Sequence, residues 1–368
     1  MYSHAKVNTV LIFILFLITG CGRTEPAAPS STPETVVPTI TPTTIPISNN
    51  QIISSENATQ LKTVATLDLP ESFVNTIIFS PDSRTMITAD RNGEVLLWER
   101  GTWEAATFLP AQSSYAADSE AQIWFWGTLA LSPDGNLIIN AYGDDGVVTG
   151  RKLDGQTVFS ISFGARVYSI ALSPDGKLLA VGGLKNNVII FNLETQQQVE
   201  DLVSEYEYIM NLDFSPDGKT LLASYERPQN VIITWGTDTW QETATFPHTA
   251  ERTDYHDVLF SPDGLELVIA TIEQEEIIFL NIATKEITKE LTEHNRAAYQ
   301  IAFSPDGNLL ASAGDDGMFR IWDANTGESL KVFYIDQEIG AVAFSPDGSL
   351  IAISIWTEGV IVWDIPRE

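Results

Sequence analysis

A short turn sequence recurs seven times in this chain of 368 residues and sets a period for most of its length. Six copies read Ser-Pro-Asp-Gly after Phe or Leu, and only the first differs, with Ser83 in place of the glycine. Gaps between successive serines run from 41 to 52 residues. A fixed period of this length indicates a repeated supersecondary unit. The copies begin at Ser80, Ser132, Ser173, Ser215, Ser261, Ser304 and Ser345.

The residues of this motif favour a tight turn between two strands. Proline presets φ, aspartate hydrogen-bonds its own backbone, and glycine accepts a positive φ without a Cβ clash. An alternating apolar run precedes the turn, as in 168–172, and a β-rich run follows it, as in 178–181. A third run often ends in an aromatic residue, as in 319–322, and a more polar fourth run closes the unit, as in 330–333. Four short strands per unit of about 40 to 45 residues predict propeller blades.

Two dipeptides make the family resemblance specific. Trp322-Asp323 and Trp363-Asp364 follow the third run of their units, and residues 60–368 as a whole resemble the WD40-repeat family. The resemblance implies a structural, hydrogen-bonded tetrad in the sixth unit, made of His294, Ser312, Asp316 and Trp322. The second unit departs most from the family, because Arg151-Lys152 stands where the aromatic residue is expected.

The two ends of the repeat region predict how a ring would close. The last unit ends soon after its third strand, at 359–363, so one blade lacks its outer strand. Residues 61–68, just before the first unit, read as the missing strand. We therefore expect an all-β, seven-bladed β-propeller of four-stranded antiparallel blades, closed by an N-terminal strand in the last blade.

The N-terminal residues indicate export and a lipid anchor. Lys6 precedes a short apolar run over 7–18, and Ile18-Thr19-Gly20-Cys21 resembles the bacterial lipobox, whose cysteine is lipidated. A chance cysteine beside an ordinary secretion signal or membrane anchor is the alternative. Residues 1–20 are therefore predicted to be a lipoprotein signal peptide, 21–59 the lipidated Cys21 with a disordered Pro/Thr/Ser-rich tether, and 60–368 the propeller. The expected location is the bacterial cell envelope, with the membrane contacted through the N-terminal lipid.

Charge and motifs restrict the function. The formal net charge of −29 disfavours binding to nucleic acid. No histidine pair has metal-ligand spacing and no nucleophile elbow or phosphate loop is present, so we expect no enzyme activity, no metal and no cofactor. His256 reads as a satisfied polar group near the channel. The sequence Gly-Asp-Asp-Gly at 143–146 and 314–317 reads as a tight turn, with calcium binding as a minor alternative.

One face of such a ring collects the turns between second and third strands and the connections between blades, including an insertion at 111–122. Aromatic and arginine side chains are the usual anchors of protein interfaces. For Trp124 and Trp126, packing between blades is the competing interpretation. The candidate partner-binding residues on this face are Arg91, Tyr115, Trp124, Trp126, Tyr142, Lys185, Tyr225, Arg227 and Trp356.

These features favour an envelope-anchored, non-catalytic platform for protein partners, monomeric as a propeller. The alternative is a ligand-binding or hydrolytic propeller, handling a peptide or glycan in a pocket at the channel mouth. A TolB-like propeller shares the Phe-Ser-Pro-Asp-Gly turn, but it lacks the Trp-Asp dipeptides found here.

Overall fold

Seven four-stranded antiparallel sheets make up the part of the chain that the structure describes. The computed structural model describes residues 51–69, 73–111, 129–142, 146–247, 255–272, 275–335, 337–356 and 358–364. Within these ranges the helical structure is one short 3₁₀ turn, η1 (Ala58–Gln60). The protein is therefore all-β, as the repeat predicts.

Each blade runs from an innermost strand to an outer one, in chain order. Blade 1 has β2 (Val74–Phe79), β3 (Thr85–Asp90), β4 (Val95–Glu99) and β5 (Ala105–Leu109). Blade 2 has β6 (Leu129–Leu131), β7 (Leu137–Tyr142), β8 (Val147–Lys152) and β9 (Thr157–Ser162). Blade 3 has β10 (Val167–Leu172), β11 (Leu178–Gly183), β12 (Asn187–Asn192) and β13 (Gln197–Val203). Blade 4 has β14 (Glu207–Phe214), β15 (Thr220–Arg227), β16 (Val231–Gly236) and β17 (Glu242–Pro247).

The remaining blades follow the same order. Blade 5 has β18 (Tyr255–Phe260), β19 (Glu266–Thr271), β20 (Ile277–Asn281) and β21 (Ile287–Leu291). Blade 6 has β22 (Ala298–Phe303), β23 (Leu309–Gly314), β24 (Met318–Asp323) and β25 (Ser329–Tyr334). Blade 7 has β26 (Ile339–Phe344), β27 (Leu350–Ile355), β28 (Gly359–Asp364) and, from the start of the folded region, β1 (Lys62–Asp68).

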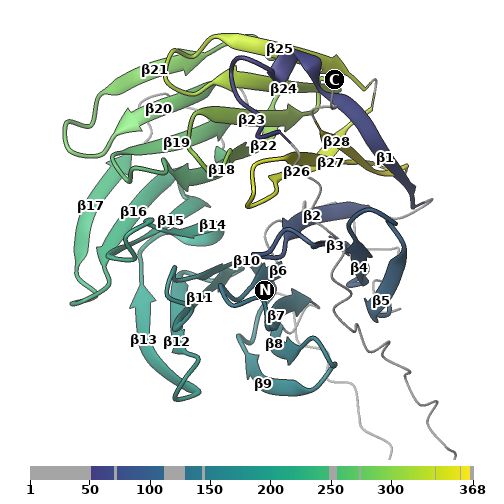
Figure 1. The fold of residues 1–368 in the computed structure, drawn as a ribbon. Helices are drawn as coiled ribbons and strands as arrows, with labels where there is room; N and C mark the ends of the chain where they lie inside the picture. The colour runs from purple at the N-terminus through teal and green to yellow at the C-terminus, as the bar shows by residue number, and fades with distance from the viewer. Residues whose placement is uncertain are drawn as a thin grey trace, which may run out of the picture. The chain divides into compact units, whose positions relative to one another are not determined.

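The innermost strands close a ring. Each of them contacts the innermost strand of the blade before and after it, and β26 of blade 7 contacts β2 of blade 1 (Figure 1). Seven sheets with seven such contacts form a seven-bladed β-propeller. The predicted fold class is confirmed.

β1 supplies the outer strand that blade 7 lacks. It pairs antiparallel with β28 from Lys62 opposite Asp364 to Asp68 opposite Gly359, and the purple β1 lies beside the yellow β28 in Figure 1. The predicted closure is therefore confirmed. The packed region nevertheless starts before residue 60, because Ile53 and Ala58 are buried in the core shared by blades 6 and 7.

Burial explains why the strands differ in composition. Every residue of β23 and β27 is buried, because a middle strand packs against neighbouring blades on both faces. An outer strand such as β13 is mostly exposed, with Leu202 as its one buried residue. The apolar middle runs therefore hold the ring together, and the polar fourth runs face water.

The repeated turns are held by their serine as well as by the residues considered above. In blade 6, Gly307 N donates to Ser304 O at 2.9 Å, and Gly307 has a φ of 74°. The Ser304 hydroxyl donates to Asp306 Oδ1 at 2.6 Å and accepts the amide of Leu309 at 2.9 Å. Serine thus links the turn to the strand that leaves it, which accounts for its presence in every copy.

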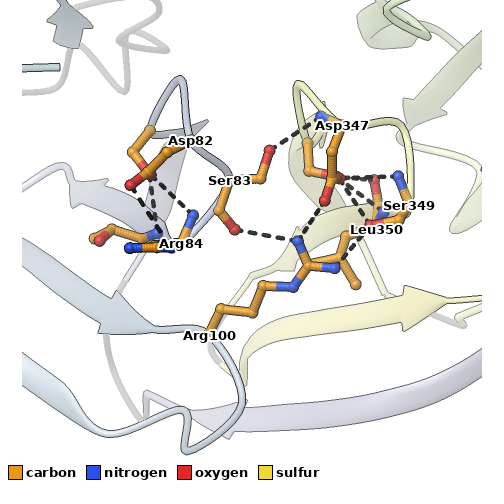
Figure 2. A network of polar contacts seen from close by, with 10 residues as sticks. Asp82, Ser83, Arg84, Arg100, Asp347, Ser349 and Leu350 are labelled. Carbon is orange, nitrogen blue, oxygen red and sulfur yellow. Dashed lines mark hydrogen bonds and ion pairs between the residues drawn. The ribbon is translucent and has the colours of Figure 1, made fainter. Parts of the chain in front are cut away.

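The one turn that departs from the repeat lies where the ring closes. In the other six turns the glycine lies beside the proline of the preceding blade; a Cβ on Gly176, for example, would come 2.9 Å from Pro133. Ser83 instead faces blade 7, and its hydroxyl accepts the amide of Asp347 at 3.0 Å (Figure 2). The substitution therefore adds a hydrogen bond between blades 7 and 1.

Arg100 reinforces the same junction. Figure 2 shows its guanidinium between the turns of blades 1 and 7. Nη1 lies 2.7 Å from Asp347 Oδ2 and donates to Ser83 O at 3.2 Å, while Nη2 donates to Ser349 Oγ at 2.7 Å. We call Ser83, Arg100, Asp347 and Ser349 the closure latch.

Blade 2 keeps the repeat register despite its missing aromatic residue. Arg151 pairs with Ile138, as Trp322 pairs with Leu310 in blade 6. Its guanidinium donates to Asn140 Oδ1 at 3.0 Å, and the Thr149 hydroxyl donates to the same oxygen at 2.8 Å. Arginine therefore takes the tryptophan position by bonding to a polar neighbour.

Candidate functional site

Strand direction sorts the loops of the ring onto two faces. The Ser-Pro-Asp-Gly turns join first to second strands and share one face, here the SPDG face. Turns between second and third strands, such as 91–94, 184–186 and 228–230, share the other with the connections between blades. We call this second face the variable-loop face, and loops on a rigid scaffold are where binding residues collect.

Two predicted anchors, Arg91 and Trp356, meet on the variable-loop face through a third residue. The guanidinium carbon of Arg91 lies 3.4 Å from the ring centroid of Phe73. The Phe73 and Trp356 rings meet edge to face, with centroids 5.1 Å apart and an interplanar angle of 88°. Arg91 is exposed and both rings are half-buried. This anchor cluster therefore joins blades 1 and 7 and presents a cation above aromatic carbon.

A buried carboxylate shapes the turn that carries Arg91. Asp90 is 8% exposed, and its Oδ1 accepts the amides of Asn92 at 2.9 Å and Glu94 at 2.8 Å. Arg91 N donates to Phe73 O at 3.0 Å. Burial lowers the pKa of Arg91, and the charge of Asp90 opposes that effect. The backbone therefore fixes the guanidinium above the ring.

Acidic residues follow the anchor cluster along the same face. Trp356 N donates to Glu338 O at 3.0 Å. Burial raises the pKa of Glu338, and the neighbouring charge of Asp315 raises it further. Asp315 also pairs with Arg296 at 3.5 Å. This part of the face thus offers aromatic, cationic and anionic groups together.

Lys185 lies on the same face in the turn between β11 and β12. Its ammonium lies 4.8 Å from the Phe163 ring centroid and donates to Phe163 O. The side chain therefore stabilises the connection between blades 2 and 3 as well as contributing charge to the face.

Tyr225 lies in the interior, which corrects its proposed place on the binding face. It is 1% exposed and packs against Trp235 and Tyr206, with ring centroids 6.5 and 6.0 Å away. The alternation of β15 turns this ring toward the neighbouring blade. Its burial raises the pKa of the phenol.

The other sequence candidates lie outside the described parts of the chain. Cys21, Tyr115, Trp124 and Trp126 fall in undescribed segments, and Tyr142 and Arg227 are described only as strand backbone. Phe73 is the functional candidate that the sequence reasoning missed. Its signal is an aromatic residue directly before the innermost strand β2.

The tetrad residues of blade 6 do come together. His294 Nε2 lies 2.6 Å from Ser312 Oγ, and Trp322 Nε1 donates to the same oxygen at 2.8 Å. His294 Nδ1 lies 2.8 Å from Asp316 Oδ2. Burial alone would raise the pKa of Asp316, but the hydrogen bond and charge of His294 outweigh it and leave the pKa lowered. The network ties the segment before β22 to strands β23 and β24.

The Asp316 carboxylate is fully engaged in its turn. Besides His294, it accepts the amides of Asn295 at 3.2 Å and Met318 at 3.0 Å. These contacts give Asp316, the second acidic residue of the sequence 314–317, a structural role in the turn. Among the described residues, no group of three or more His, Cys, Asp and Glu side chains is placed to hold a metal ion.

His256 lies on innermost strand β18 and is 8% exposed. Its Nδ1 lies 3.1 Å from Tyr299 O, and the two rings lie 4.5 Å apart. Burial lowers the pKa of His256 to about 3, so the ring is neutral at physiological pH. The side chain is satisfied by its neighbours, as the sequence reading proposes.

Within the described ranges, no helix has the length and apolar character needed to cross a bilayer.

Known families match the repeat region in three segments. Residues 61–99 and 285–323 match the family described as WD domain, G-beta repeat, and residues 129–217 match the family described as Anaphase-promoting complex subunit 4 WD40 domain. These segments are therefore similar to WD40 repeats, and the seven-bladed fold agrees with that similarity.

Several plant proteins are similar to this chain. A guanine nucleotide-binding protein subunit beta from Nicotiana tabacum is 26% identical over 222 residues, covering 56% of this chain and 58% of the relative. A WD repeat-containing protein WDS homolog from Arabidopsis thaliana is 26% identical over 281 residues, covering 73% of this chain and 50% of the relative. The chain thus spans between half and three fifths of the length of these relatives.

Proposed function

We propose that this chain is a non-catalytic protein-interaction platform, anchored at the bacterial cell envelope, whose partner docks on the variable-loop face. The anchor cluster of Arg91, Phe73 and Trp356 carries the proposal. It places an exposed guanidinium over the half-buried Phe73 ring, which meets Trp356 edge to face, and this is the composition of an interface hot spot. The names of the beta-subunit relatives, which are parts of assemblies, support a binding role.

Envelope anchoring rests on the sequence around Cys21. A lipid on Cys21 would tether the propeller through the Pro/Thr/Ser-rich segment that follows it. In a bacterial host, wild-type protein should incorporate labelled palmitate and sediment with membranes, while Cys21→Ser should do neither. Unlabelled wild-type protein in the soluble fraction would contradict the anchor.

The platform is tested by affinity capture from envelope extracts with the lipidated full-length protein. Trp356→Ala and Arg91→Ala should each reduce recovery of a specific partner at least tenfold, since hot-spot truncations cost about 2 kcal/mol or more. Tyr334→Ala is the matched control, because Tyr334 is an aromatic residue 78% exposed on outer strand β25.

Two results would contradict the platform. One is unchanged partner recovery by both cluster variants. The other is turnover of a peptide or glycan by the wild-type protein, which would favour the alternative of a hydrolytic propeller.

A further inference from the structure

Side chains on four of the innermost strands join their blade to the next one. An innermost strand is a sheet edge, so part of its backbone lacks a partner in its own blade. Ser169 Oγ accepts Leu212 N at 3.0 Å, Asp257 Oδ2 accepts Ile301 N at 3.0 Å, and Gln300 Oε1 accepts Val342 N at 3.3 Å. All three acceptors stand four residues before a turn serine. Three of the repeats therefore use the same position as a link between blades.

The links around blade 5 differ because they use carboxyl groups. Asp213 Oδ2 accepts Phe260 N at 3.0 Å, which joins blade 4 to blade 5. Asp257 joins blade 5 to blade 6, and its Oδ1 accepts Asn211 Nδ2 at 2.9 Å. Two ionisable groups thus hold three consecutive blades at the channel.

The surroundings of these two carboxyl groups disfavour their charged forms. Burial raises the pKa of Asp213 to about 7, and the charge of Asp257 raises it further. The hydrogen bonds from backbone amides act in the opposite direction and lower it. Burial raises the pKa of Asp257 to about 6, again against its hydrogen bonds. Both residues are half-buried, so solvent screening moderates these effects.

No cation compensates the pair within the described surroundings. The paired neighbours are Leu222 of β15, opposite Asp213, and Ala270 of β19, opposite Asp257. Innermost strands β10 and β22 contribute the neutral Ser169 and Gln300. The charged group that acts on Asp213 is therefore Asp257 itself.

The junction between blades 4 and 5 is also looser on the SPDG face than the junctions among blades 1 to 4. A Cβ on Gly264 would lie 3.7 Å from Pro216, compared with 2.9 to 3.5 Å for the glycine-proline neighbours of blades 1 to 4. A groove of about 800 Å³ opens there, and Phe260 is among its lining residues. The same residue donates the amide that Asp213 accepts.

We propose that Asp213 and Asp257 form a proton-responsive pair, which holds blades 4, 5 and 6 together most firmly when protonated and loosens them when both carboxyls ionise. The unfolded chain releases these protons near pH 4, whereas the folded chain keeps them until about pH 6 to 7. The stability contributed by the pair therefore falls as pH rises through that window and is constant above it.

Two measurements on the full propeller test this device. Carbonyl NMR of Asp-labelled wild-type protein should show two side-chain titrations with midpoints above pH 5, and Asp213→Asn should remove one of them. Urea unfolding of Asp213→Asn should show an unfolding constant roughly tenfold to a hundredfold below wild type at pH 8, and within about twofold of it at pH 3.5.

Glu207→Gln is the matched control, since it removes one acidic charge from an exposed position on the same strand β14. Its stability should follow wild type at both pH values, which separates the pair from the general effect of the net charge. The proposal would be overturned if the unfolding constants of Asp213→Asn and Glu207→Gln changed in parallel with pH. It would also be overturned if every aspartate side chain followed by NMR titrated with a midpoint below pH 4.5. The NMR titration of the wild-type protein tests the raised midpoints of the two carboxyl groups even if a variant fails to fold.

Discussion

Replacing Arg100 with methionine should weaken the ring at its closing junction. Methionine keeps much of the length of the side chain but removes the contacts to Asp347, Ser349 and Ser83 O, which lie 2.7, 2.7 and 3.2 Å from the guanidinium. The Arg100 and Asp347 side chains are 16% and 34% exposed, so the pair is neither fully buried nor a free surface contact. The closure latch would lose its only cation.

The magnitude follows from what Asp347 retains. Its carboxylate still accepts the Ser345 and Ser349 hydroxyls at 2.6 and 2.7 Å and the Ser349 amide at 3.1 Å, so it is not left unsatisfied. The loss should lie between an exposed pair, at about 0.5 kcal/mol, and a broken buried pair, at about 4 kcal/mol. We expect about 2 kcal/mol of unfolding free energy, or about 4 °C in Tm for a domain of this size.

Urea and thermal unfolding of Arg100→Met, followed by tryptophan fluorescence, measure this loss. Arg84→Met is the matched control, because Arg84 lies 4.0 Å from Asp82 in the same blade with 44% and 60% of the two side chains exposed. Burial would raise the pKa of Asp347, but its hydrogen bonds to Ser345, Arg100 and Ser349 leave it lowered. The loss of unfolding free energy in Arg100→Met should therefore be complete above about pH 4, and it should become smaller as pH falls below that value. Equal effects of the two arginine variants would refute this reasoning.

Three further outcomes are expected. Deleting residues 60–70 should give aggregated protein, since blade 7 loses β1; a soluble monomer with unchanged melting would contradict the closure. His294→Ala should lower the unfolding free energy by about 2 to 3 kcal/mol, because it leaves Ser312 and Asp316 buried with fewer partners, and a urea-measured loss below about 0.5 kcal/mol would argue against that role. Calcium titration should give neither heat nor a melting shift, as Asp316 is already engaged; a saturable heat would revive the calcium alternative.

The repeat made the fold predictable because its signals are local. Turn chemistry and strand period can be recognised within a single unit, and the number of blades follows from counting the units. The closure by residues 61–68 follows from the one strand that the last unit lacks. The role of Ser83 was not predictable in this way. Its departure from glycine has a reason only once blade 7 lies beside it.

The site was harder to predict because it depends on the ring. The sequence predicts Arg91 and Trp356 separately, each from its own loop. Their shared contact with Phe73 exists only because blades 1 and 7 are neighbours. The prediction for Tyr225 is wrong because a position near a loop does not determine whether the ring points to the surface or into the core, where it packs against Trp235. The carboxyl links of Asp213 and Asp257 depend on the register between separate blades, which no single repeat encodes.

The platform proposal is tested most directly by finding what touches the variable-loop face. A photoreactive benzoyl-phenylalanine at position 356, introduced into the lipidated full-length protein and irradiated in envelopes, should form a covalent adduct with one discrete partner. The same group at position 334, on the exposed outer strand β25, should form none. A partner adduct at 334 with none at 356 would contradict the account.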